Sequence, residues 1–241
     1  MNILVTGVSR GVGVAICRVL LAAGHAVYGV SRSRSEEVER LSQEYPQMFR
    51  FLNVDLQDCD AARRAIFGKD FISNAVPLDA LVNNAAMAYD DIITNLNLGK
   101  LEAMYRVNVF TPMLLTKYAI RNMIFNRIGG AIVHISSVSA HTGYKGLAMY
   151  ASSKASMEAF SKNTAREWGG KGIRSNVVVP GFMDTAMSAT LSAEQKERIY
   201  KRTSLKADTK IESVAATVAF LLSDGACSIT GQNIHVDNGT I

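Results

Sequence analysis

Short apolar runs alternate with segments of helical periodicity along the whole chain of 241 residues. Strand-like runs lie at Asn2–Thr6, Ala26–Val30, Met48–Val54, Leu78–Val82, Ala131–Ile135, Ile173–Val179 and Asn233–Val236. Helical patterns lie at Val14–Gly24, around Glu36–Arg40, at Asp58–Phe71, Leu101–Asn126, Met149–Trp168, around Ala193–Lys201 and at Ile211–Leu222. This alternation predicts one α/β domain, a doubly wound parallel sheet of about seven strands with helices on both faces.

Two segments depart from the regular pattern. Pro112 lies inside the Leu101–Asn126 pattern, where a proline predicts a kink or loosened hydrogen bonding. The segment 182–210 holds a polar helix but no firm core pattern. Such a segment is typical of a mobile lid over a site, and we expect it to act as one.

The composition is that of a globular protein, with 48% hydrophobic and 20% charged residues. No apolar stretch approaches the roughly 20 residues that span a bilayer, and the first residues enter a strand pattern without a signal-peptide pattern. We therefore expect a cytoplasmic protein without a membrane segment. The net charge of +5 comes from dispersed lysines and arginines, which favours anionic small molecules or an acidic partner over nucleic acid.

Neither the cysteines nor the histidines show the spacing of a metal site. The three cysteines, Cys17, Cys59 and Cys227, are far apart in the sequence and form no C-x-x-C pair. The four histidines show no H-E-x-x-H or related ligand spacing. We expect free thiols, no disulfide framework and no metal.

The first strand runs into a glycine-rich turn that opens the first helix, Thr6-Gly7-Val8-Ser9-Arg10-Gly11-Val12-Gly13. Glycines let the backbone turn tightly and approach a ligand, while the helix N-terminus attracts phosphate. The second strand ends at Ser31-Arg32-Ser33-Arg34, where a nucleotide-binding fold contacts the adenosine ribose. Because two arginines and no acid lie there, with Arg10 as a third candidate, the pattern indicates NADP(H) over NAD(H). The alternatives are a plain strand-to-helix turn and arginines that only solvate a loop.

A second group of polar residues lies between Ser136 and Lys154. Ser136 and Ser137 follow the carboxyl end of the strand-like run Ala131–Ile135, and a helical pattern begins near Ala148. Tyr150 and Lys154 stand four residues apart, so a helix presents both on one face. At an effective dielectric of about 20, a charge some 4 Å away is worth roughly 4 kcal/mol, or about three pKa units. Lys154 is therefore predicted to lower the pKa of Tyr150 to around neutrality, where the phenol acts as a general acid. The inert alternative is that this spacing arises by chance on an exposed helix.

Six motifs in order resemble the short-chain dehydrogenase/reductase family over essentially the whole chain. They are Thr6-Gly7-x-x-x-Gly11-x-Gly13, Asn83-Asn84-Ala85, Asn108, Ser137, Tyr150-x-x-x-Lys154 and Pro180-Gly181-x-x-x-Thr185. Within the family, the segments Pro180–Met187, Leu191–Gln195 and Ile229–Asp237 are most similar to the 3-oxoacyl-acyl-carrier-protein reductases of fatty acid synthesis. Related reductases of other carbonyls share much of this tail. The chain departs from the family pattern at Ala86 and Asn238, where glycine is usual.

The resemblance implies a Rossmann-like fold with a cofactor half over about residues 1–130 and a catalytic and substrate half over about 131–241. It implies that the cofactor phosphates lie against Gly7, Ser9, Arg10, Gly11 and Gly13. The place of Arg32 after the second strand makes it the candidate that binds the 2′-phosphate. By the same resemblance, the adenine lies at Asp55 and Leu56, the ribose at Asn84, and the nicotinamide end at Met183 and Thr185, beside Tyr150 and Lys154. For catalysis it selects Ser137 as the partner of the carbonyl oxygen, and Asn108 as the holder of a water that links Lys154 to solvent.

The function implied by the resemblance is NADPH-dependent reduction of a 3-oxoacyl thioester on acyl carrier protein or a CoA-like carrier. The alternative on the same fold is turnover of another ketone or secondary alcohol, in polysaccharide or secondary-metabolite synthesis. A non-catalytic cofactor-binding protein is the alternative from another class. The resemblance also implies a homotetramer, or a homodimer, paired through the long helices and the last strand. If acyl carrier protein is the partner, basic groups are expected at the site entrance, and Arg127 and Lys171 are the candidates.

Overall fold

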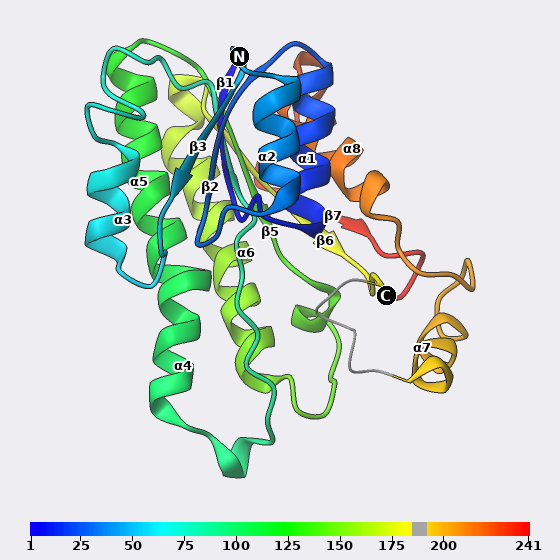
Figure 1. The fold of residues 1–241 in the computed structure, drawn as a ribbon. Helices are drawn as coiled ribbons and strands as arrows, with labels where there is room; N and C mark the ends of the chain where they lie inside the picture. Colours follow the sequence, from blue (N-terminus) through cyan, green and yellow to red (C-terminus); the bar gives the residue numbers. More distant parts are fainter. Residues whose placement is uncertain (185–191) are drawn as a thin grey trace.

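The computed structural model describes residues 1–184 and 192–241 (Figure 1). Within this described part, seven strands form one parallel sheet in the order β3-β2-β1-β4-β5-β6-β7. The strands are β1 Asn2–Thr6, β2 Ala26–Ser31, β3 Phe49–Asn53, β4 Ala80–Asn83, β5 Ala131–Ile135, β6 Arg174–Pro180 and β7 Asn233–Val236. The order changes direction between β1 and β4, which is the switch point where doubly wound sheets bind their ligands.

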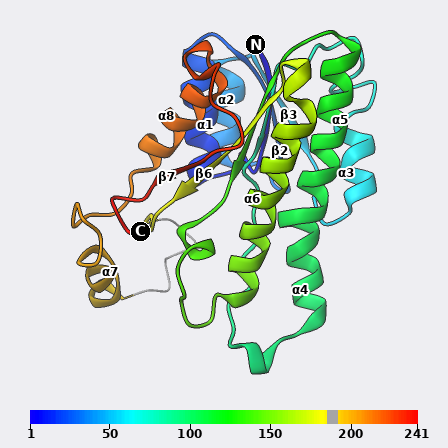
Figure 2. The same ribbon diagram turned by 180° about the vertical axis from the view of Figure 1, so that it is seen from behind.

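Helices cover both faces of this sheet (Figures 1 and 2). They are α1 Gly11–Ala22, α2 Glu36–Glu44, α3 Cys59–Ile66, α4 Leu98–Tyr105, α5 Thr111–Phe125, α6 Ala148–Trp168, α7 Ala193–Tyr200 and α8 Ile211–Leu222. One face carries α1, α2 and α8, and the other carries α3, α5 and α6. The doubly wound α/β architecture predicted from the sequence is confirmed. In the described part, none of the helices has both the length and the apolar character that crossing a bilayer requires.

Each face of the sheet has its own apolar core, because side chains alternate between the faces along a strand. On β1, Val5 packs towards α1 and α8, whereas its neighbour Leu4 packs towards α3 and α5. The helices complete these two cores with fully buried side chains such as Ile16, Leu20, Val218 and Leu221 on the first face, and Ile66, Leu115 and Met123 on the second. Each such side chain contributes roughly 1.5–3 kcal/mol of burial, so the strand ends sit on a rigid frame.

The long helix predicted around Pro112 is interrupted near its centre. A π-helical turn, Arg106–Phe110, separates α4 from α5. Pro112 has no N–H to donate to the carbonyl oxygen four residues earlier, which belongs to Asn108. The backbone N–H of Thr111 donates instead to Arg106 O, five residues back. The loosened hydrogen bonding expected from Pro112 is therefore present, and it surrounds Asn108.

Part of the predicted lid is tied to the C-terminal segment. The backbone N–H of Leu205 donates to Asn238 O at 3.1 Å. The Nδ2 of Asn238 donates to Ala207 O at 2.9 Å and to Asp208 O at 2.8 Å. Asn238 has a φ of 58°, in the left-handed region that asparagine tolerates better than most residues. The asparagine that stands where glycine is usual thus keeps the backbone conformation and adds two hydrogen bonds.

Candidate active site

The predicted site segments meet at one edge of the sheet. The central strands are parallel and in register, with Val5 beside Val82 and Val82 beside Val133, so their carboxyl ends lie together. The glycine turn follows β1, Asn84 follows β4, and Ser137 follows β5. Helix α6 begins at this same edge (Figure 1). The topology therefore brings a phosphate-binding type of turn and the serine, tyrosine and lysine to one side of the molecule.

Three glycines shape the turn between β1 and α1. Gly7 and Gly11 have φ angles of +75° and +59°, which residues with side chains rarely adopt. A Cβ at Gly13 would lie 2.0 Å from the carbonyl oxygen of Gly7, so the helix packs directly on the turn. A Cβ at Gly11 would meet nothing within 4 Å. The glycines are therefore required by the backbone, and the turn is open on its Gly11 side.

The N-terminus of α1 receives no cap from the side chain of Arg10, its N-cap residue. The first turn of the helix also contains no acidic residue. The first N–H groups of a helix have no acceptor within the helix and carry partial positive charge. Ser9 O accepts a hydrogen bond from Ser35 Oγ at 2.7 Å, which fixes the turn against the start of α2. The turn can therefore bind a phosphate group through its backbone N–H groups.

The three candidate arginines differ in what they already bind. Arg34 Nε donates to Glu39 Oε1 at 2.6 Å, and its guanidinium lies 5.5 Å from the centre of the Phe51 ring. Arg10 and Arg32 are exposed, and neither forms an ion pair with any of the described residues. Arg10 and Arg32 are thus the arginines that remain available to an anionic ligand.

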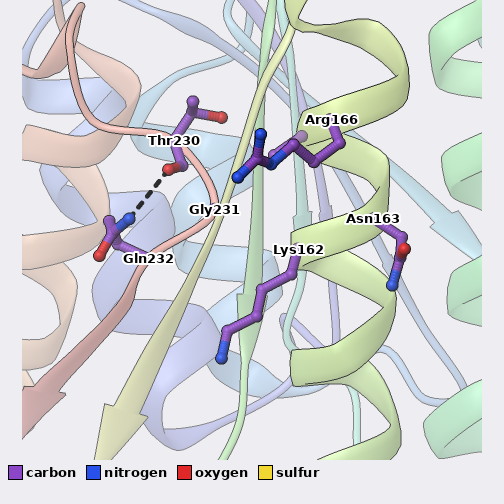
Figure 3. A pocket seen from close by; sticks show the side chains of 7 residues that line it. Lys162, Asn163, Arg166, Thr230, Gly231 and Gln232 are labelled. Carbon is purple, nitrogen blue, oxygen red and sulfur yellow. Dashed lines mark hydrogen bonds between the residues drawn. The ribbon is translucent and has the colours of Figure 1, made fainter.

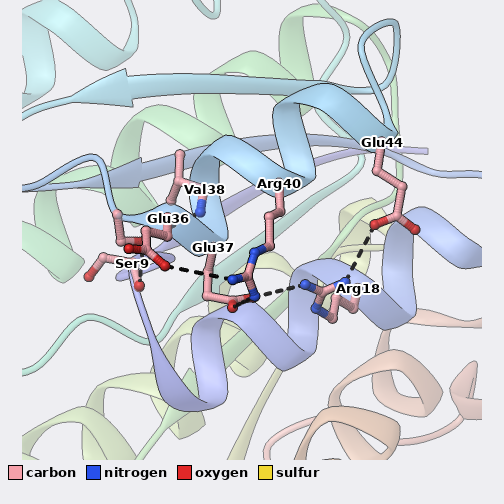
Figure 4. Close-up of polar contacts among 8 residues, drawn as sticks. Ser9, Arg18, Glu36, Glu37, Val38, Arg40 and Glu44 are labelled. Carbon is pink, nitrogen blue, oxygen red and sulfur yellow. Dashed lines mark hydrogen bonds and ion pairs between the residues drawn. The ribbon is translucent and has the colours of Figure 1, made fainter.

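Acidic side chains of α2 are engaged with its neighbours (Figure 4). Glu37 accepts hydrogen bonds from Arg18 and Arg40, each at 2.8 Å, and Glu36 lies 3.6 Å from Arg40. With Glu39 held by Arg34, these acids of α2 are all paired with arginines. The end of β2 therefore lacks the carboxylate that would favour a ribose hydroxyl over a phosphate.

Asn84 clamps the glycine turn to the end of β4. Its Nδ2 donates to Thr6 O at 2.9 Å and to Gly7 O at 3.1 Å, and its backbone N–H donates to Thr6 Oγ1 at 3.0 Å. The residue expected at the cofactor ribose is thus also a structural tie between two strands. The side-chain nitrogen makes both contacts with the turn, and the side-chain oxygen of Asn84 takes part in neither.

The remaining predicted cofactor residues have different surroundings. Asp55 is exposed, and its Oδ1 accepts from Gln57 N at 2.9 Å, whereas Leu56 is buried. Met183 packs against the apolar core of the α1 and α8 face. Thr185 lies outside the described residues. Asp55 and Leu56 both follow β3, so they lie at the same sheet edge as the glycine turn.

Asn108 is buried in the π-helical turn, and its side chain is fully engaged. Its Oδ1 accepts from Met87 N at 2.8 Å, and its Nδ2 donates to Met87 O at 2.8 Å and to Ser153 Oγ at 3.0 Å. Asn108 therefore links the segment after β4 to α6, which carries the tyrosine and the lysine. The backbone carbonyl of Asn108 has no donor four residues on, because that residue is Pro112.

Ser137, Tyr150 and Lys154 come together beyond the end of β5. Lys154 is buried, and its Nζ donates to Ile135 O at 2.8 Å. The same nitrogen lies 5.7 Å from the centre of the Tyr150 ring. Hydrogen bonding from the Ser137 hydroxyl lowers the pKa of Tyr150, and Ser137 Oγ accepts from Ser139 Oγ at 3.0 Å. The structure thus brings the phenol, the ammonium and one serine hydroxyl together, as the spacing in the sequence predicts.

The predicted lowering of the Tyr150 pKa is wrong for this structure. Burial raises the pKa of Tyr150 to about 12, the charge of Asp90 raises it further, and only the hydrogen bond with Ser137 lowers it. Burial also lowers the pKa of Lys154 to about 8. The sequence estimate considered the attraction of a nearby cation but left out the cost of removing a charged phenol from water. That cost is the largest influence on the pKa of Tyr150, and Lys154 directs its hydrogen bond to Ile135 O.

Three residues at this site lie outside the motifs identified in the sequence. Asp90 lies in the segment after β4 and raises the pKa of Tyr150. Ser139 donates to the Ser137 hydroxyl from its own hydroxyl and its backbone N–H. Glu158 is buried on α6 and accepts a hydrogen bond from Ser136 Oγ. Glu158 follows Lys154 by four residues on the same helix, but this spacing does not show that its side chain is buried.

The two candidate carrier-protein residues lie away from this edge. Arg127 precedes β5 and Lys171 precedes β6, so both lie at the amino ends of strands whose carboxyl ends form the site. The segments that follow them contact each other there, since a Cβ at Gly129 would lie 3.0 Å from Gly172 O. The expectation that they flank the entrance is therefore wrong within one chain, because parallel strands place all their amino ends at the opposite edge.

A surface hollow of about 520 Å³ lies between the second half of α6 and the loop before β7 (Figure 3). Lys162 and Arg166, one turn apart on α6, face the segment Thr230–Gln232, where Gln232 Nε2 donates to Thr230 O at 3.2 Å. None of the residues lining this hollow belongs to the predicted site. Within the described residues, no group of three or more His, Cys, Asp or Glu side chains is placed to hold a metal ion.

Two curated relatives match the chain over nearly its full length. The 3-oxoacyl-acyl-carrier-protein reductase FabG of Aquifex aeolicus (strain VF5) is 36% identical over 240 residues, which cover 98% of this chain and 95% of the relative. Carbonyl reductase (NADPH) 2 of Sus scrofa is 34% identical over 241 residues, which cover 99% of this chain and 96% of the relative.

The family model and the solved structures agree with these relatives. The model described as enoyl-(acyl carrier protein) reductase matches residues 7–240. The crystal structure of a blue fluorescent protein from a metagenomic library, in complex with NADPH, is 31% identical with a TM-score of 0.88. The match covers 99% of this chain and 97% of that one. The chain belongs to the short-chain dehydrogenase/reductase family, whose members are oxidoreductases acting on CH–OH and C=O groups.

Proposed function

We propose that the protein reduces a ketone to a secondary alcohol with hydride from NADPH, and that the ketone is a 3-oxoacyl thioester. The observation that supports the reduction is the meeting of Ser137, Tyr150 and Lys154 at the sheet edge that also carries the glycine turn. The thioester is supported by the similarity to FabG of Aquifex aeolicus over 98% of this chain.

NADPH fits the residues at the ends of β1 and β2. The uncapped N-terminus of α1 and the open side of the turn at Gly11 suit a pyrophosphate. Arg10 and Arg32 suit a 2′-phosphate, because the acids of α2 are already paired with arginines. The similarity to carbonyl reductase (NADPH) 2 and to a structure in complex with NADPH supports the same cofactor.

The reduction needs a proton at the carbonyl oxygen while the carbonyl carbon receives hydride, which bound NADPH supplies. Tyr150 is protonated at neutral pH, since burial raises its pKa to about 12, and it donates that proton to the oxygen. Ser137, hydrogen-bonded to Tyr150, binds the same oxygen and stabilises the charge that develops on it. The ammonium of Lys154 stabilises the tyrosinate that remains. Lys154 and a water at Asn108 would then relay a proton from bulk solvent to the tyrosinate, which restores the phenol.

Changing Arg32 to aspartate is expected to lower the preference for NADPH over NADH. A hydrogen bond to a charged group is worth about 1.5–3 kcal/mol, so the ratio of the two kcat/KM values should fall about 10- to 100-fold. The measurement is kcat/KM for each cofactor at a fixed ketone concentration. Arg34→Asp is the matched control, because Arg34 already binds Glu39 and should change the ratio much less. Equal ratios in the wild-type protein and the Arg32 variant would remove Arg32 from the phosphate site.

Turnover of an acetoacetyl thioester with NADPH, compared with a panel of simple ketones, tests the substrate. A kcat/KM for the thioester at least about tenfold above every other ketone supports the proposal, since this corresponds to about 1.4 kcal/mol of selective transition-state binding. Reduction of another ketone with higher efficiency would assign the protein to the alternative, a reductase or dehydrogenase of a different carbonyl or alcohol. The similarity to a carbonyl reductase favours this second candidate.

A non-catalytic, cofactor-binding role is the third candidate, and it predicts NADPH binding without turnover of any ketone. It is disfavoured because the serine, tyrosine, lysine and asparagine of the catalytic pattern are all present. A homotetramer or homodimer stays a prediction. Exposed apolar side chains on and beside α5, Phe110 and Phe125 with 51% and 67% of their surface accessible, are of the kind that association buries.

A further inference from the structure

We propose that Glu158 is a positioning residue that fixes Ser137 relative to Tyr150 and Lys154. The proposal rests on the proposed reduction, because it assigns Glu158 a role in aligning the groups that carry it. Glu158 lies on α6, away from the sequence motifs, and only 7% of its surface is exposed. A buried carboxylate is costly unless it is hydrogen-bonded, so its partners indicate what it does.

The carboxylate of Glu158 receives donors from three separate segments. Ser136, which follows β5, donates from its Oγ to Oε1 of Glu158. Asn233, on β7, donates from its Nδ2 to Oε2 at 2.6 Å. The ring Nε2 of His141, in the loop after β5, lies 2.9 Å from Oε2. One side chain of α6 thus holds a strand end, a loop and a second strand.

Two of these three contacts bracket Ser137. Ser136 directly precedes it, and His141 follows it by four residues. Between them runs a short 3-10 turn, Val138–Ala140, which Ser137 caps by accepting from Ser139 N at 3.2 Å. Both ends of the turn are therefore attached to a single carboxylate, and the Ser137 hydroxyl lies between the two attachments.

The carboxylate is also in fixed register with the catalytic helix positions. Tyr150, Lys154 and Glu158 follow each other at intervals of four residues, so they form one stripe along α6. Lys154 Nζ binds Ile135 O and Glu158 binds the hydroxyl of Ser136, the next residue. The helix that carries Tyr150 therefore forms hydrogen bonds with the two residues immediately before Ser137. A displacement of about 1 Å between these groups is enough to cost roughly 100-fold in rate.

Lys154 lies one turn before Glu158 on α6, and His141 brings a second histidine, His235, to the cluster. The rings of His141 and His235 are in edge-to-face contact, with their centres 4.8 Å apart. His235 lies on β7, two residues after Asn233. The His141 side chain is 29% accessible, so the cluster reaches the protein surface at the two histidines.

The test compares Glu158→Gln with Glu167→Gln, the same change at an exposed position of the same helix. Glu158→Gln is expected to lower kcat about 10- to 100-fold, to leave the dissociation constant for NADPH within about twofold, and to change KM less than kcat. Glu167→Gln should change none of these values. A loss in NADPH affinity equal to the loss in kcat would overturn the proposal, because it would indicate general disruption of the fold.

A double-mutant cycle with Ser137→Ala tests whether Glu158 acts through Ser137. In the Ser137→Ala background, adding Glu158→Gln should change kcat by less than about twofold, because the group that it positions is already gone. Fully multiplicative losses would overturn the proposal. If Ser137→Ala alone loses no activity, the proposed role of Ser137 in the reduction fails instead. The positioning role of Glu158 is then tested by a measurement that does not depend on enzyme activity.

Hydrogen exchange of the backbone gives that independent measurement. Residues 137–142 are expected to exchange at least about tenfold faster in Glu158→Gln than in the wild-type protein, while 150–160 on α6 stay unchanged. Ser136→Ala removes one attachment and leaves the carboxylate in place, so it should give a smaller change in the same direction, even if Glu158→Gln folds poorly. Unchanged exchange of 137–142 in both variants would overturn the proposal.

Discussion

Changing Tyr150 to phenylalanine is expected to lower kcat for ketone reduction by about 10³-fold or more, while NADPH still binds. General acid catalysis contributes about 10²–10⁴-fold, and the phenol is the proton donor in the proposed reduction. The variant loses only one oxygen, which is hydrogen-bonded to Ser137, so the ring keeps its packing in the small cluster around Met104 and Met149. The glycine turn follows β1 and is not part of α6, so the substitution leaves it unaffected. The measurements are steady-state kcat and a titration of the intrinsic fluorescence with NADPH.

Tyr105→Phe is the matched control for this variant. Tyr105 contacts the same cluster, and its hydroxyl bonds Ser152 Oγ at 3.0 Å on the outer side of α6. Its loss should change kcat less than about threefold, because it removes an exposed hydrogen bond worth about 1 kcal/mol or less. If the Tyr150 variant keeps more than about a tenth of the wild-type kcat, another group donates the proton. Equal losses in both tyrosine variants would indicate damage to the cluster rather than loss of the acid.

Local spacing explains why much of this site could be predicted from the sequence. Tyr150 and Lys154 lie on the same face of a helix whatever the fold around it, because an interval of four residues is about one helical turn. The glycine turn and Ser137 follow apolar runs, and parallel strands bring such run ends to one edge. The π-helical turn at Asn108 follows from the missing N–H of Pro112. Each of these inferences needs only neighbours within about one helical turn and the direction of the strands.

The features that could not be predicted depend on burial and on partners distant in the sequence. The pKa of Tyr150 rises because the fold removes the phenol from water, which no spacing reveals. Glu158 gathers partners from three segments that lie 17 to 75 residues away, and a glutamate on a helix is usually a solvated side chain. Arg127 and Lys171 were assigned to the entrance although they precede β5 and β6. That expectation considered the charge of an acidic partner and left out the direction of the strands.

Changing Lys154 to methionine is expected to abolish most activity and yet to stabilise the protein at pH 7. Burial lowers the pKa of Lys154 to about 8 from 10.5, so the folded state pays about 3 kcal/mol to keep this ammonium charged below pH 8. Methionine has a similar length and carries no charge, but it leaves Ile135 O without its donor, which costs about 1–3 kcal/mol. The net gain in the free energy of unfolding should be about 1 kcal/mol. The measurement is urea unfolding of both proteins at pH 7 without cofactor.

The sign of the effect reverses with pH in a way that separates charge from packing. Between pH 8 and 10.5 the folded wild-type protein has lost the Lys154 proton, whereas the unfolded chain still binds it. Because the unfolded state then binds more protons, the contribution of Lys154 to stability rises with pH across this window and is complete above it. The advantage of about 1 kcal/mol that Lys154→Met has at pH 7 should therefore become a net loss of about 1–2 kcal/mol at pH 10, because the wild-type protein regains about 1.4 kcal/mol per pH unit above pH 8. Lys162→Met, at an exposed position of the same helix, should give no such change. A Lys154 variant that is equally destabilised at both pH values would show that the amine is held by its hydrogen bond more strongly than burial opposes its charge.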